Sequence, residues 1–450
     1  MHRDSQGLAV TTASATAAEA WNHTLAGYLG YRADTGARLA ATLAADPEFG
    51  LAHCLSGYFA LLGFNAALLQ AAAEALARAR RLTATASARE QAHVAALAAW
   101  LDGAPDRAVA VWETILRDHP RDVLAFRLAH FVNFWLGRPD RMLASVIAVA
   151  PHWDEALPGW GTLLACRCFA LEECGHYTEA EAAGRAAIAL DPSDLWAAHG
   201  VAHVLEMQGR RGEGIAWIDG LSAQWEGANN LRHHLYWHAA LFHYEHGAFD
   251  RVLALYDRQF RNLAAPLSLA QPDLYIDVQN AAAMLFRLQR QGVAVGDRWT
   301  ELADKAEARI GDCLSAFTLP HWAMALAATG REAAAERLID AMRGFGAGAG
   351  GLAAQVRDYA LPVAAAVLAH ARGRHAEALD LMRPALGGMH QLGGSHAQQD
   401  VFEQLFLDAA LAAGSAEDAR LLLQRVAGRH VVPLARRRGY AAAARQLGFA

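Results

Sequence analysis

Apolar residues recur along the whole chain at the spacing of an amphipathic helix. Alanine, leucine, arginine and glutamate alternate at this spacing, and runs of β-branched residues are short. The pattern predicts helices in nearly every segment, including residues 122–136, 193–208 and 231–246. Because strand signals are nearly absent, we expect an all-α fold.

The helical segments repeat with a period near 34 residues. Gly103 and Gly137 are 34 residues apart, as are Gly175 and Gly209, while 38 residues separate Gly209 from Gly247. Hairpins of the tetratricopeptide type have this period. Glycine in a left-handed cap would end one helix, and a proline seventeen residues after Gly103 or Gly175 would start the next. The sequence therefore predicts a tetratricopeptide-type solenoid, a superhelix of roughly ten helical hairpins.

Composition divides the chain into four stretches. Residues 1–20 are expected to form an N-terminal tail, and residues 21–343 a helical-repeat solenoid with a Pro/Trp-rich connector at 150–161. A Gly-rich loop at 344–351 precedes C-terminal helical repeats of the same superhelix at 352–450. The loop contains G-x-G-x-x-G, but a dinucleotide-binding loop follows a strand, and this one follows a helical pattern. We therefore expect no nucleotide site there.

Composition and charge narrow the classes of partner. The 450 residues are 54% hydrophobic and 19% charged, the net charge is −6, and Lys305 is the only lysine. A phosphate-binding surface needs concentrated positive charge, so we expect no nucleic-acid partner. The most apolar run is broken by Asn65, Gln70 and Glu74, so we expect no membrane span. Five cysteines without a CxxC pair favour reduced thiols in a cytoplasmic protein.

Two of the predicted helices carry histidines where such repeats usually carry alanine. His199, His203 and Glu206 are spaced four and three residues apart and share one helix face, and His234 and His238 repeat the spacing in a second helix. Both helices follow an interhelix loop, which makes each the first helix of a hairpin. Since first helices line the concave groove of a tetratricopeptide superhelix, we expect His199, His203 and His238 to point into one shared cavity.

Several interpretations of these histidines are open. In the first, the histidines are structural groups that are hydrogen-bonded inside the core. In the second they bind a polar molecule, and in the third they act as general acids and bases together with a carboxylate. Histidines four residues apart also suit a divalent metal, although H-E-x-x-H is absent and the sequence requires no cofactor; the metal ligands would be His199, His203 and His238. The candidate catalytic residues are His203, Glu206 and His238. The candidate ligand-binding residues are His130, His199, His234, Trp237, Asp277, His321 and Asp400.

The leading functional hypothesis is a repeat protein whose groove binds a small polar molecule or a peptide end. One alternative is an enzyme, a hydrolase or lyase that uses histidine and carboxylate acid–base chemistry or a metal. The other is a purely scaffolding module for protein–protein interaction, the usual work of such solenoids. Each of the three is compatible with an oligomer.

The serine in "GGSHAQQD" has two interpretations, a nucleophile or a helix cap. Gln398 follows Ser395 by three residues, which is the spacing of a capping box. We therefore predict that Ser395 opens a helix at residue 396 and that Asp400 lies one turn inside it.

Six stretches go beyond a generic repeat: "REQAHV", "VWETILRDHPRDVLA", "DPSDLWAAHGVAHVLEM", "YWHAAL", "RLQRQGVAVGDRW" and "LGGSHAQQDVFEQL". With them the chain resembles the tetratricopeptide repeat protein 38 family of bacteria and animals, from about residue 20 to about residue 430. The family implies a helical-repeat fold and no settled biochemical role. Asn280 departs from its pattern, where a carboxylate is expected. The residues that match the pattern are His93, His130, His199, His203, Glu206, His238, Asp277, Ser395, Gln398 and Asp400.

Overall fold

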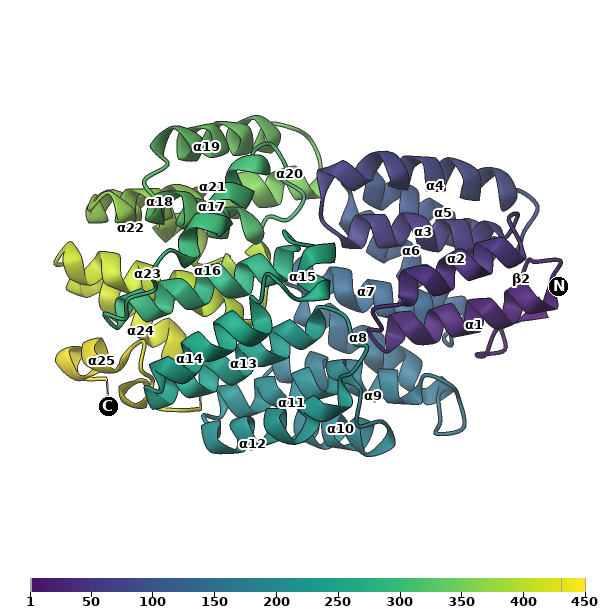
Figure 1. Cartoon of the computed structure of the whole chain (residues 1–450), viewed down its shortest axis with the longest axis horizontal. Coiled ribbons are helices and arrows are strands. Elements are labelled where there is room, and N and C mark those ends of the chain that lie inside the picture. Colours follow the sequence, from purple (N-terminus) through teal and green to yellow (C-terminus); the bar gives the residue numbers. More distant parts are fainter. Residues whose placement is uncertain (1, 430, 450) are drawn as a thin grey trace. The chain divides into compact units, whose positions relative to one another are not determined.

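The computed structural model describes residues 2–429 and 431–449, and most of them lie in helices (Figure 1). The β-structure among these residues consists of one antiparallel pair of two-residue strands, β1 and β2, and an isolated bridge between Arg32 and Ala228. Helices that follow one another in the chain pack as hairpins, as in α3 with α4 and α9 with α10. The predicted all-α, tetratricopeptide-type helical-repeat fold is confirmed.

The elements up to the middle of the chain begin and end as follows. They are β1 His2–Arg3, β2 Ala9–Val10, α1 Ala15–Leu29, α2 Thr35–Ala45, α3 Gly50–Leu62, η1 Ala66–Leu68, α4 Leu69–Leu82, α5 Ala88–Leu101, α6 Pro105–Asp118, α7 Val123–Trp135, α8 Pro139–Val149, η2 Ala150–His152, α9 Trp160–Glu173, α10 Tyr177–Leu190, α11 Leu195–Met207, α12 Arg211–Leu221 and η3 Ser222–Gln224.

The remaining elements include two short π-helical turns, η4 and η5. In order they are α13 Leu231–His246, α14 Phe249–Leu255, η4 Tyr256–Phe260, α15 Pro266–Ala270, α16 Tyr275–Arg290, α17 Arg298–Ala308, α18 Thr318–Ala328, α19 Glu332–Gly346, α20 Gly351–Gln355, η5 Val356–Ala360, α21 Leu361–Ala371, α22 His375–Leu386, η6 Met389–Leu392, α23 His396–Ala412, α24 Ala416–Ala427, η7 Leu434–Arg436 and α25 Ala441–Leu447.

The predicted turn glycines end helices as the repeat requires. Gly103, Gly137, Gly175, Gly209 and Gly247 each lie in the short turn after α5, α7, α9, α11 or α13. Their φ angles lie between 64° and 82°, in the left-handed region that only glycine adopts without strain. The turn positions predicted from the 34-residue period are therefore confirmed.

The role predicted for the prolines is wrong. Pro120 and Pro192 lie in the loops before α7 and α11, not in the first turn of either helix. An aspartate caps each helix instead: the carboxylates of Asp122 and Asp194 accept a hydrogen bond from the backbone N–H three residues on, both at 2.9 Å. A carboxylate satisfies one of the free N–H groups at a helix start, which proline cannot do.

Two predicted stretches contain more structure than expected. Residues 1–20, expected as a tail, include the β1–β2 pair and the start of α1 at Ala15. In the stretch 344–351, α19 continues to Gly346 and α20 begins at Gly351, so the irregular part is shorter than the glycine content suggests. The segment before the G-x-G-x-x-G spacing is helix α19, which agrees with the argument against a nucleotide site.

The chain forms two compact units. Unit 1 comprises residues 1–201, 221–231 and 350–352, and unit 2 the remainder. The division falls inside α11, which is continuous across it. Each unit has its own core of large buried side chains, such as Trp21, Trp112 and Phe126 in unit 1 and Trp237, Phe242 and Phe260 in unit 2.

One helical segment, Gly351–Ala371, has the length and hydropathy of a membrane span. Half of its apolar window is buried inside the protein. Core helices of soluble proteins have the same length and composition, so this feature alone does not overturn the expectation of no membrane span.

Close packing in unit 2 depends on a glycine of α12. A Cβ atom built on Gly214 would lie 2.4 Å from the Phe242 ring, whereas one built on Gly220 in the same helix meets nothing within 4 Å. We expect Gly214→Ala to lower the free energy of unfolding by about 1–3 kcal/mol, because the ring must move. Gly220→Ala, the matched control, should raise it by up to about 1 kcal/mol. Urea denaturation of both variants tests this, and equal effects would contradict it.

Candidate functional site

The histidine pairs on α11 and α13 are buried in an otherwise apolar environment. His199 and His203 are one turn apart on α11, and His234 and His238 are one turn apart on α13, so each pair presents two imidazoles on one helix face. At most 3% of any of the four side chains is exposed. Alanine, valine and leucine occupy most other positions of α11. The sequence thus places four polar rings where burial is costly unless they have a role.

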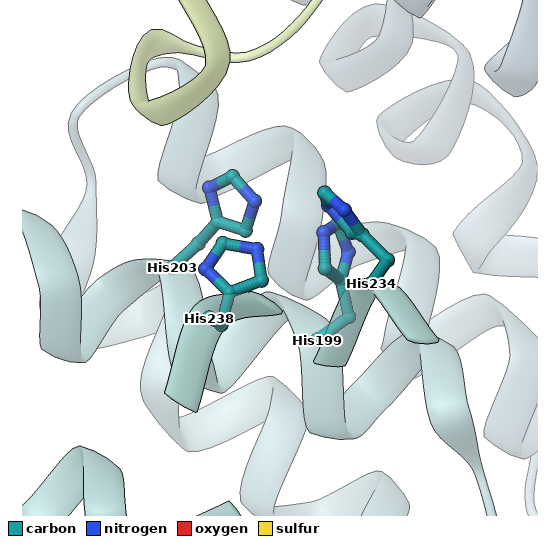
Figure 2. A group of neighbouring side chains, drawn as sticks. All are labelled: His199, His203, His234 and His238. Carbon is teal, nitrogen blue, oxygen red and sulfur yellow. The ribbon is translucent and has the colours of Figure 1, made fainter. Parts of the chain in front are cut away.

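The four imidazoles face one another (Figure 2). One ring nitrogen of each lies within 4.8 Å of one nitrogen of every other. The ring centroids of His203 and His238 are 4.5 Å apart, and those of His234 and His238 are 4.8 Å apart. We call His199, His203, His234 and His238 the four-histidine cluster. The structure thus brings together the three histidines expected to share a site and adds His234.

Burial favours the neutral form of three rings of the cluster, those of His203, His234 and His238. Burial lowers the pKa of His203 and of His238 well below the usual range, and the neighbouring imidazoles add to this effect. Burial also lowers the pKa of His234 to about 4, although its hydrogen bond to Asn280 acts in the opposite direction. A neutral imidazole has one nitrogen lone pair available, which is the form that ligates metals.

Residues around the cluster orient its rings. The Nδ1–H of His234 donates to the side-chain oxygen of Asn280 at 2.9 Å, which fixes the orientation of that ring. The Trp237 ring stacks on His234 with a centroid distance of 5.1 Å and an interplanar angle of 14°. Asn280, at the position where the family resemblance leads one to expect a carboxylate, therefore supplies the acceptor that fixes a histidine tautomer.

Glu206 lies outside the cluster, although it is on the same helix as His203. Burial raises the pKa of its carboxyl to about 7, and the charge of Arg437 partly offsets this. Asp400, Glu245 and Arg211 also act on this carboxyl, and Glu245 forms an ion pair with Arg211 at 2.9 Å. Glu206 is not among the groups whose ligand atoms lie within 4.8 Å of one another, and its predicted role with His203 and His238 stays a prediction.

Asp277 and His321 make their contacts elsewhere in unit 2. The Asp277 carboxylate accepts a hydrogen bond from Nδ1 of His233 at 3.1 Å, which joins α13 to α16. His321 donates from Nδ1 to the carbonyl of Phe317 at 2.8 Å, and its ring packs against Phe402 at 4.9 Å. Both residues were candidates for ligand binding, and both lie in the packed core.

Asp400 joins three parts of unit 2. Its carboxylate accepts hydrogen bonds from Arg287 at 3.2 Å, Gln404 at 2.6 Å and the Tyr440 hydroxyl at 2.6 Å, and Arg437 lies 3.4 Å away. These donors occupy most of the acceptor capacity of a carboxylate. Asp400 therefore links α23 to α16 and to the C-terminal segment, and it is not a member of the four-histidine cluster.

His130 lies in unit 1 among aromatic rings. Its ring centroid is 6.3 Å from that of Phe126, 6.2 Å from Phe169 and 5.9 Å from Trp196. The sequence pattern placed it on the same kind of helix as His199, but it is not a member of the four-histidine cluster.

Sequence reasoning missed two residues with clear roles. His233 follows the same helical pattern as His234, but the next position around a helix points about 100° away, and it pairs with Asp277 instead. Arg127 is 97% buried on α7, and no local signal marks it, since an arginine within a helix is usually exposed. The prediction for Ser395 is confirmed: it caps α23, and Gln398 completes the capping box.

Comparison with known proteins adds little evidence about the fold. No family model matches the chain. Yeast Tom70 is similar over 92% of this chain and 84% of its own, at 11% identity and a TM-score of 0.37. The Naa15/Naa10 structure bound to HypK-THB is similar over 96% of this chain and 74% of its own, at 14% identity and a TM-score of 0.22. The fold described above rests on the helices and turns of the chain itself, which is a tetratricopeptide-type helical-repeat protein.

Proposed function

We propose that this protein is a helical-repeat metal-binding protein in which His199, His203, His234 and His238 hold one divalent transition-metal ion. The observation that supports the proposal is the approach of four buried ring nitrogens to within 4.8 Å of one another. Two pairs of ligands, each spaced four residues apart on neighbouring helices, are a common way to build a metal site between helices.

Zinc fits the ligand set best. Zn²⁺ binds imidazole nitrogens at about 2.0–2.1 Å in a tetrahedron, which puts the nitrogens about 3.4 Å from one another. The cluster is wider than this, so its rings must tighten around the ion by at most about 1.4 Å for the widest pair. The Asn280 contact supports the same assignment, because a metal-bound histidine usually donates its second N–H to an oxygen.

The other functions considered have less support. Catalysis by His203, Glu206 and His238 needs a carboxylate beside the rings, and Glu206 is not among the groups that meet within 4.8 Å of one another. A small polar molecule or a peptide end is a second candidate occupant of the same cluster, and binding of a partner protein suits the repeat fold. We also propose membership of the tetratricopeptide repeat protein 38 family, on the stretches quoted above, and a cytoplasmic location, on the five free thiols.

Metal titration of the metal-free protein tests the proposal. We expect one Zn²⁺ or Co²⁺ per chain, with the intense visible absorption of tetrahedral Co²⁺. His203→Gln and His238→Gln should each weaken binding by at least about 100-fold, because each removes a direct ligand. The matched control is His233→Gln, which removes a buried histidine of the same helix α13 that pairs with Asp277.

Three results separate the alternatives. Metal binding that is lost in both ligand variants and kept in His233→Gln supports the site. Binding that is unchanged in His203→Gln places the metal elsewhere and contradicts it. The third result is a wild type that binds no metal, with a large loss of stability in all three variants. It would show that the cluster has a purely structural role.

A further inference from the structure

A second group of polar residues lies in unit 1 on helix α7. Arg127, His130 and Asn133 follow one another at intervals of three residues, which places each about 60° further around the helix than the last. They are 3%, 0% and 0% exposed. Burying polar side chains is costly unless they find hydrogen-bond partners, so the partners of these three residues need an explanation.

Arg127 has few of the partners that a buried guanidinium needs. Its Nη2 group donates to the Tyr31 hydroxyl, and its central carbon lies 4.6 Å from the ring centre of Trp196 and 5.3 Å from that of Tyr31. Its Nη1 group has no hydrogen-bond partner among the described residues. A buried arginine elsewhere in unit 1 differs: Arg89 binds the Asp122 carboxylate at 2.6 Å. Among the described residues no carboxylate forms an ion pair with Arg127, although the buried Asp194 carboxyl is near enough for the charge of Arg127 to lower its pKa.

The residues beside Arg127 also offer unused hydrogen-bonding groups. Neither ring nitrogen of His130 and neither polar atom of the Asn133 side chain has a partner among the described residues, and the same holds for the indole N–H of Trp196. The His130 and Trp196 rings are 5.9 Å apart, and the Arg127 guanidinium lies over Trp196. Arg127 and His130 of α7 thus meet Trp196 of α11, and Asn133 lies three residues beyond His130 on α7.

We propose that Arg127, His130, Asn133 and Trp196 bind a small organic carboxylate. The guanidinium supplies a charge-assisted hydrogen bond to a carboxylate oxygen, and the indole, imidazole and amide supply further hydrogen bonds. This inference is independent of the metal proposal, since it concerns other residues.

Charge and burial define the ligand further. Burial lowers the pKa of His130 well below its usual range, and the charge of Arg127 adds to this, so Arg127 is the one cation of the group. A single positive charge suits a monoanionic carboxylate better than a phosphate dianion. The side chains are all at least nine-tenths buried, which suits an enclosed small molecule rather than a peptide in an open groove.

Calorimetric titration with acetate, propionate and lactate tests this site, with inorganic phosphate and chloride at matched ionic strength as anion controls. We expect saturable binding of at least one of the three carboxylates and a roughly 10- to 100-fold weakening in Arg127→Met, which keeps the apolar stem and removes the charge. In the absence of carboxylate, Arg127→Met should unfold at the same temperature as the wild type or at a higher one. Arg89→Met is the matched control and should lower the unfolding temperature without changing carboxylate affinity in the protein that remains folded.

Either of two results would overturn the site, and a third would overturn its ligand class. One is no saturable binding of any of the three carboxylates by the wild type. The other is an Arg127→Met variant that loses stability while it keeps the wild-type carboxylate affinity, which would make Arg127 a structural residue. Preference for phosphate over every carboxylate would also contradict the stated ligand class.

Discussion

Replacing Asp122 by alanine is expected to lower the free energy of unfolding by about 3–5 kcal/mol, because it breaks a buried ion pair and a helix cap together. The Asp122 carboxylate binds Arg89 at 2.6 Å and Nε2 of His93 at 3.1 Å, and it accepts from the N–H of Ala125 at 2.9 Å. Burial raises the pKa of this carboxyl, but His93 and Arg89 outweigh it and hold the pKa well below its usual range. Without the carboxylate, the buried Arg89 guanidinium keeps its hydrogen bond to the carbonyl of Ala9 but loses its ion pair.

Denaturant unfolding near neutral pH measures this effect. The control is Asp34→Ala, since Asp34 caps α2 without a side-chain hydrogen bond to a backbone N–H. Its side chain is 57% exposed, and its ion pair with Arg38 at 3.1 Å is therefore a weak surface contact. The control should leave the unfolding free energy nearly unchanged. A loss below about 1 kcal/mol in Asp122→Ala would show that the Arg89–Asp122–His93 network contributes little.

Acidification is expected to destabilise the protein through its buried neutral histidines, and His321 isolates the effect. Burial lowers the pKa of His321 to about 3, although its hydrogen bond to the Phe317 carbonyl acts in the opposite direction. In the unfolded chain a histidine has a pKa near 6.5. Between pH 6.5 and about 3 the unfolded state therefore binds a proton that the folded state does not. The contribution of His321 to the free energy of unfolding is complete above pH 6.5 and decreases as the pH falls. At pH 4 this residue has lowered the free energy of unfolding by about 3 kcal/mol.

Measuring the free energy of unfolding against pH for the wild type and for His321→Leu tests the sign and the size of this effect. The variant should lose stability less steeply between pH 6.5 and pH 4, a range in which Asp122 stays ionised. His152→Leu is the control, because His152 is exposed and outside the core. If the free energy of unfolding fell equally steeply with pH in His321→Leu and in the wild type, the result would contradict the account. A wild type that is more stable at pH 4 than at pH 7 would contradict its sign.

The parts of the fold that depend on local sequence were predictable. The turn glycines were found because a left-handed residue ends a helix and recurs with the repeat, and Ser395 was found because a capping box spans only four residues. The prediction that proline starts the next helix was wrong because proline is accepted both in a loop and in a first helical turn. The sequence does not decide between these two positions. The division of the chain inside α11 has no local signal at all.

The candidate site was predictable where helical spacing alone defines it. Histidines at four-residue intervals on two helices were expected to meet, and they do. The partners of Asp277 and Asp400 were not predictable, because they depend on which distant helices pack against α16 and α23. Glu206 shares a helix with His203, yet the next turn of α11 faces a different set of charges.

X-ray absorption at the zinc edge, on protein saturated with one zinc ion per chain, tests the four-histidine centre most directly. The account predicts a first shell of four nitrogen atoms at about 2.0–2.1 Å with the scattering pattern of imidazole rings, lost in His203→Gln and His238→Gln. A first shell that contains sulfur, or that consists mainly of water and carboxylate oxygen, or that is unchanged in both variants, would contradict it.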